Sequence, residues 1–127
     1  MPISFQEPLN ADLFDRIALE HARRVGLRDD GKPKNENKPT QLRRFYDELL
    51  LWEERVAQAP ERFDECLPFI RMINAKTAYA QGRKLVDATF ADLMRETLAA
   101  VSDARSLAHC KTFWEAFMGF YKLVRTD

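Results

Sequence analysis

The sequence has few of the residues on which several classes of site depend. Only two of its 127 residues are cysteines, and they lie far apart without a Cys-x-x-Cys motif. Together with the two histidines they match no zinc-binding spacing, so we expect no metal site and no cofactor, and both thiols reduced in the core. The four residues are Cys66, Cys110, His21 and His109. The four glycines form no phosphate-binding loop, and no Ser-His-Asp or His-Glu-x-x-His signature is present.

The sequence also lacks an excess of charge of either sign. Its 20 Lys and Arg residues balance 20 Asp and Glu residues, which excludes a uniformly basic nucleic-acid binder but leaves room for local patches. No apolar run approaches the length of a membrane span. Residues 1–14 lack a basic region followed by an apolar stretch, so we expect no signal peptide and a cytoplasmic protein without membrane contact.

Apolar residues recur at helical spacing through most of the chain, and no segment alternates with the period of a strand. We therefore predict one all-α domain over residues 1–127, a compact bundle of about five helices. Helices are expected over residues 12–25, 41–59, 67–86, 87–101 and 103–124. Residues 1–9 are predicted to form a loose arm. Residues 28–39, rich in Pro, Asn and charges of both signs, are predicted to form an exposed loop.

The stretch 67–86 carries apolar residues on several sides, which predicts a helix packed at the centre of the domain. It also carries cations and no acid. Lys76 and Arg83 are two turns apart, so they share one side of the helix with Met72 and Tyr79. Because a buried unpaired cation is costly, these side chains must reach solvent, an acidic partner or a bound anion. The cations of the stretch are Arg71, Lys76, Arg83 and Lys84.

Other patterns have a structural and a functional interpretation. Arg16 precedes His21 at a spacing found in helical ribonucleases of the HEPN class, where such a pair acts on a phosphate. Because Ile17 and His21 lie on the apolar stripe of the helix, we favour a histidine at the edge of the core. The aromatic residues of the last helix could stack bases, but at helical spacing they favour core and a protein interface. Acids cluster around the end of the second helix and are best interpreted as a solvated face.

Two segments resemble a known family. QLRRFY at residues 41–46 and LPFIRMINAKTAYAQGR at residues 67–83 are similar to the small subunit of type III-A CRISPR–Cas interference complexes, the Csm complexes. The likeness covers roughly residues 40–124. Its second segment combines Leu-Pro, a basic residue, Ala-Lys, Tyr-Ala and Gly-Arg in the expected order.

This resemblance implies a helical, non-catalytic RNA-binding subunit that lines up in several copies as a filament. The implied partners are guide RNA, target RNA, the backbone and large subunits, and further copies of the chain. Guide pairing supplies sequence specificity, so the small subunit needs only sequence-independent backbone contacts. The RNA-binding residues it implies are Arg43, Arg44, Arg71, Lys76, Arg83 and Lys84.

Lys76 and Arg83 are the contacts on which motif and helix face agree. We expect Arg71, on another side, to contact a neighbouring subunit or an acid such as Glu48. Two alternatives stay open: a HEPN-like ribonuclease that uses Arg16 and His21, and a pure protein-interaction bundle.

Overall fold

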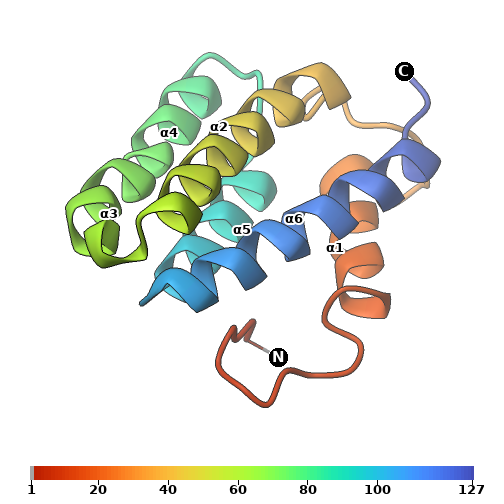
Figure 1. The fold of residues 1–127 in the computed structure, drawn as a ribbon. Coiled ribbons are helices and arrows are strands. Elements are labelled where there is room, and N and C mark those ends of the chain that lie inside the picture. Colours follow the sequence, from red (N-terminus) through yellow and green to blue (C-terminus); the bar gives the residue numbers. More distant parts are fainter. Residues whose placement is uncertain (1) are drawn as a thin grey trace.

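The computed structural model describes residues 2–127 and is all-helical, which confirms the predicted fold class (Figure 1). The elements are α1 (Arg16–Gly26), α2 (Pro39–Gln58), the 3-10 turn η1 (Pro60–Arg62), α3 (Phe63–Arg71), α4 (Ile73–Gly82), α5 (Ala88–Ala99) and α6 (Ala104–Val124). Outside these helices, Leu27 and Pro33 form an isolated bridge. None of the helices in residues 2–127 is both long and apolar enough to cross a bilayer.

The core is built around α6, which packs against both α1 and α2. Its N-terminus is fixed by a capping box: the Asp103 carboxylate accepts from the Ser106 N–H at 2.7 Å, and the Ser106 hydroxyl accepts from the Asp103 N–H at 3.0 Å. Apolar and aromatic residues recur every three or four positions along the buried side, which confirms that most of the aromatic helix is core. The buried residues are Leu107, Cys110, Phe113, Trp114, Phe117 and Tyr121.

The prediction of one central helix over residues 67–86 is wrong. Two helices, α3 and α4, meet at Met72 and lie at the edge of the molecule farthest from α1 (Figure 1). Only one side of them is buried, through residues such as Ile70 and Ile73, while Phe69 and Tyr79 are 56% and 68% exposed. The apolar residues on the other sides are uncovered because no further helix packs there.

The N-terminal arm is packed rather than loose. The Phe5 side chain is buried, with its ring centroid 6.2 Å from that of Phe113. The Ile3 N–H donates to the Glu96 carboxylate at 2.8 Å. Residues 3 and 5 therefore anchor the arm to α5 and α6, because their alternating apolar side chains extend the core.

The loop between α1 and α2 differs most from its prediction, because it contains a fully buried asparagine. The Asn37 amide nitrogen donates to the Val25 carbonyl at 2.9 Å and to the Asp87 carboxylate at 2.7 Å. Its amide oxygen accepts from the Asp87 N–H at 3.0 Å, and its own N–H donates to the Leu85 carbonyl at 3.0 Å. Asn37 has a φ of 63°, a left-handed conformation that Asn tolerates better than most residues.

Side chains from α6 and the C-terminus complete this cluster, which we call the Asn37 hub. The Tyr121 hydroxyl donates to the Asn37 carbonyl at 2.6 Å, and the buried Arg125 guanidinium donates to the Glu36 carbonyl at 2.8 Å. The Lys34 ammonium lies 2.7 Å from the Asp87 carboxylate. The hub joins the ends of α1 and α6 to the segment between α4 and α5.

We expect Asn37→Ala to lower the free energy of unfolding by roughly 2–4 kcal/mol, because several buried polar partners lose their hydrogen bonds and alanine disfavours a positive φ. Urea unfolding followed by circular dichroism measures this. Asn35→Ala, on an exposed residue of the same loop, is the matched control and should change stability by no more than about 0.5 kcal/mol. Equal effects of the two substitutions would contradict the role of the hub.

The hub also makes stability depend on pH. Burial acts to raise the pKa of Asp87, but hydrogen bonds from Asn37, Lys34 and the Phe90 N–H outweigh it and hold the pKa below its usual value of 3.8. The unfolded chain then binds the proton more readily, so this stabilisation is complete above about pH 4 and is lost as the pH falls below it.

We therefore expect Asp87→Asn to flatten the loss of stability in urea unfolding measured below pH 4, besides lowering stability at neutral pH. Asp92→Asn, on an exposed carboxylate of α5, should leave the acid limb as steep as in the wild type. If Asp87→Asn loses stability below pH 4 as steeply as the wild type, other carboxylates cause that loss.

Candidate nucleic-acid interface

Two contacts fix how α2 and the α3–α4 pair lie against each other. The Lys76 ammonium donates to both oxygens of the Glu48 carboxylate at 2.8 Å. The rings of Trp52 and Phe69 stack with centroids 5.7 Å apart and planes 17° apart. Glu48 and Trp52 are one turn apart on α2, while their partners run in the opposite order along the chain. The two segments are therefore antiparallel on this side.

This register extends by one more turn. Arg44 lies one turn before Glu48 on the same side of α2, and Tyr79 and Arg83 lie one and two turns after Lys76. The structure therefore brings Arg44 to the end of α4 that carries Arg83. We call the shared surface the α2–α4 face. Its members are Arg44, Glu48, Trp52, Phe69, Met72, Lys76, Tyr79 and Arg83.

The cations predicted to bind RNA differ in their surroundings. Lys76 is neutralised by Glu48, and the Arg43 guanidinium lies 3.1 Å from the Asp47 carboxylate. By contrast, three exposed cations make no ion pair within residues 2–127: Arg44, Arg83 and Lys84.

Arg71 lies apart from the other predicted cations. It lines a shallow hollow with Asn74 on α4 and Arg95 on α5. The expectation that it pairs with Glu48 is wrong, because Lys76 occupies that carboxylate from the side of the helix that faces α2.

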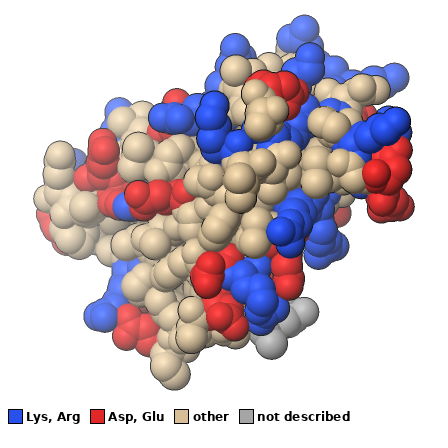
Figure 2. Space-filling model, turned by 90° about the vertical axis from the view of Figure 1, so that its right-hand side faces the viewer, with Lys and Arg blue, Asp and Glu red and all other residues tan. Residues whose placement is uncertain are grey.

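A further cation joins the unpaired ones through the hub. Arg83 and Lys84 directly follow α4, and the next residue, Leu85, accepts the hydrogen bond from Asn37. Lys38 follows Asn37 and precedes the first turn of α2, so it lies at the same end of the molecule. We call Lys38, Arg44, Arg83 and Lys84 the basic end. Figure 2 shows the side of the molecule that carries α1 and the C-terminus, where Lys and Arg gather in the upper part and alternate with Asp and Glu lower down.

Sequence reasoning missed Lys38 because no periodic pattern links a loop residue to the end of α4. The only available signal was its position immediately before Pro39 at the start of a predicted helix. The connection itself is made by Asn37, whose side chain and backbone bridge residues far apart in the sequence.

The other half of the α2–α4 face is apolar. Met72 is 53% exposed, beside the exposed Phe69, whose ring stacks on Trp52. The Arg55 guanidinium covers the Trp52 ring at 4.8 Å from its centroid. Trp52, Phe69 and Met72 form what we call the apolar patch, and exposed contiguous apolar surface of this kind is typical of contacts with other proteins.

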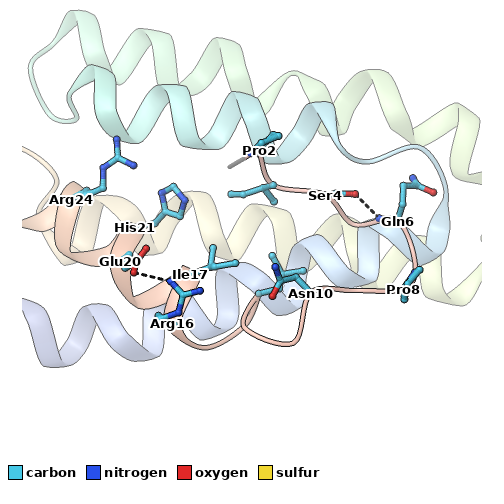
Figure 3. A pocket seen from close by; sticks show the side chains of 12 residues that line it. Pro2, Ser4, Gln6, Pro8, Asn10, Arg16, Ile17, Glu20, His21 and Arg24 are labelled. Carbon is cyan, nitrogen blue, oxygen red and sulfur yellow. Dashed lines mark hydrogen bonds and ion pairs between the residues drawn. The ribbon is translucent and has the colours of Figure 1, made fainter.

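The ribonuclease alternative can be judged from a pocket of about 360 Å³ between the N-terminal arm and α1 (Figure 3). Arg16 and His21 both line it. The Arg16 guanidinium, however, is held by Asp12 at 3.2 Å and by Glu20 at 3.1 Å. Those hydrogen bonds raise the pKa of Arg16, and the two carboxylates beside the guanidinium would repel a phosphate.

His21 is half-buried at the edge of the core, as the apolar stripe predicted. Its ring meets the Phe113 ring edge-on, with centroids 6.2 Å apart. Burial and the nearby charge of Arg24 lower the pKa of His21, which favours the neutral imidazole at pH 7.

With this geometry in place, a comparison with known families decides the assignment. The family model described as Csm2 Type III-A matches residues 18–127. The chain belongs to the Csm2 family. It is therefore a small subunit of a type III-A CRISPR complex, as the segments at residues 41–46 and 67–83 predicted. No curated protein and no solved structure matches the chain.

The Csm2 match covers nearly all of α1 and every later helix, and so contains both the basic end and the apolar patch. Arg16 and the arm that forms the other wall of the pocket lie outside it. The α2–α4 face therefore lies wholly in the family region, whereas of the Arg16 and His21 pair only His21 does.

The remaining candidate groups of this Csm2 chain form no cluster suited to metal chemistry. No group of three or more His, Cys, Asp or Glu side chains in residues 2–127 could hold an ion. Both cysteines are free, and burial raises the pKa of the Cys110 thiol to about 12. The acids around the end of α2 are mostly exposed; they are Glu53, Glu54, Glu61, Asp64 and Glu65.

Proposed function

We propose that this Csm2 protein is a non-catalytic subunit that holds the RNA of its effector complex through the basic end. The observation that carries the proposal is that Arg44, Arg83 and Lys84, which the register of α2 against α4 assigns to one end, make no ion pair in residues 2–127. Free cations attract phosphates and release the counterions condensed on RNA, whatever the base sequence. Such contacts suit a complex in which guide pairing provides specificity.

The predicted cations contribute unequally in this proposal. Arg44, Arg83 and Lys84 lead, together with Lys38. Lys76 and Arg43 contribute less, because each must share its charge with a carboxylate 2.8 Å and 3.1 Å away, respectively. Arg71 contacts a neighbouring subunit rather than RNA, since it lies on the side that faces α5.

The absence of catalysis is part of the proposal and is supported by the state of Arg16. A helical ribonuclease needs a guanidinium free to stabilise a phosphate transition state, and here Asp12 and Glu20 occupy it.

Association with further copies of the chain completes the proposal. The apolar patch lies at the other end of the α2–α4 face from Arg44 and Arg83, beyond the Glu48–Lys76 pair, and exposes Phe69 and Met72. Contacts through the patch would line up copies along one RNA strand. Weak phosphate binding by each copy then adds to a high overall affinity.

We expect Arg83→Ala combined with Lys84→Ala to weaken target-RNA binding by the reconstituted effector complex. The plot of log affinity against log salt concentration should become shallower by roughly 1.4 for each copy that contacts the RNA, because every copy loses two phosphate contacts. The matched control removes two adjacent exposed arginines of α1, Arg23→Ala with Arg24→Ala, and should leave the slope unchanged. Equal losses in both variants would contradict a localised site, and failed assembly of the first variant would move its cations to a protein interface.

We expect Met72→Asp to prevent incorporation of several copies into the complex, because a carboxylate in the apolar patch cannot be desolvated without a partner. Native mass spectrometry counts the copies, and circular dichroism checks the fold. Leu123→Asp, which introduces the same charge at the 77%-exposed Leu123 of α6, is the control and should assemble normally. A full set of copies in the Met72→Asp complex would remove the patch from the proposal.

A further inference from the structure

Tyr79 is the most exposed aromatic residue of the α2–α4 face. Its side chain is 68% exposed on the outer side of α4, although the residues on either side of its turn, Thr77 and Ala80, are buried. Its hydroxyl makes no hydrogen bond within residues 2–127. The ring therefore contributes little to the core and is available for a contact outside the chain.

The neighbours of Tyr79 are cations. The Arg83 guanidinium lies over the ring, 5.9 Å from its centroid, a cation–π arrangement that restrains both side chains. Lys84 follows Arg83, and the register set by Glu48 and Lys76 places Arg44 on the facing turn of α2. The ring is thus the flat, apolar element in the middle of the cations that are free to bind phosphates.

We infer that Tyr79 stacks on an unpaired base of the RNA strand whose phosphates the basic end holds, and this inference rests on the proposed function. An aromatic ring among cations is the arrangement with which proteins bind single strands: the cations follow the backbone and the ring receives a base. Stacking is tolerant of sequence because every base has a π face. The site therefore takes single-stranded RNA of any sequence and prefers it to a backbone that carries no bases.

A protein partner for the ring is the competing explanation, and the surroundings of Tyr79 disfavour it. The apolar patch begins at Met72, two turns away along the α3–α4 pair, and Lys76 with its bound Glu48 separates the two. Burial of Tyr79 in a protein contact would also bury Arg83, whose guanidinium has no carboxylate partner in residues 2–127, and an unpaired buried cation is costly.

The test compares binding of oligouridylate with binding of an oligomer of the same length made of abasic ribose. The full chain, isotope-labelled, is titrated with each at millimolar concentration, so that weak binding is still measured by nuclear magnetic resonance. We expect oligouridylate to bind about tenfold more tightly than the abasic oligomer. The Tyr79 ring protons should move upfield with the first ligand only.

Three variants separate the possible causes. Tyr79→Phe should keep the preference for the base-bearing strand, while Tyr79→Leu, which preserves apolar contact but has no π face, should abolish it and leave abasic binding unchanged. Arg83→Ala with Lys84→Ala should weaken both ligands alike. Equal binding of the two oligomers by the wild-type chain, or a preference retained by Tyr79→Leu, would overturn stacking. If the resonances of Arg83 and Lys84 still shift on titration in that case, the proposed phosphate binding is retained. No response of these residues to either oligomer would overturn both proposals.

Discussion

The position of the candidate interface depends on the buried side chain of Asn37. Its amide group bonds at once to the end of α1, through Val25, and to the segment between α4 and α5, through Asp87. Its backbone carbonyl receives the hydroxyl of Tyr121 from α6. Because these bonds are buried, each unsatisfied partner would cost free energy, so the arrangement is specific. It places Asn37, the residue before Lys38, against Leu85, the residue after Lys84.

The ion pair of Lys76 with Glu48 fixes how two helices pack, and it leaves Lys76 less able to bind an anion. Lys76 donates to both carboxylate oxygens, and with the stack of Trp52 on Phe69 it sets the register of α2 against α4. The same contact neutralises the charge of Lys76. On the α2–α4 face the cations without an ion pair in residues 2–127 are Arg44 and Arg83, and the Arg83 guanidinium lies over the Tyr79 ring.

Much of the fold could be predicted from the sequence, because local signals agree with it. The periodic apolar residues of α2 and α6 predicted those two helices correctly, and the stripe through Ile17 placed His21 at the edge of the core. The signals failed where apolar residues serve an uncovered surface. Phe69 and Met72 suggested a central helix, but they lie on the outside of the α3–α4 pair.

The sequence by itself determined most of the helices, the family and which cations have no acid nearby along the chain. It did so because helical periodicity, caps and the two family segments depend on residues close in sequence. Only the tertiary structure decided which of those cations are free. Ion pairing depends on side chains that packing brings together, such as Glu48 with Lys76, 28 positions apart. The loop residue Asn37, which has no periodic signal at all, acquires its role from partners up to 88 positions away.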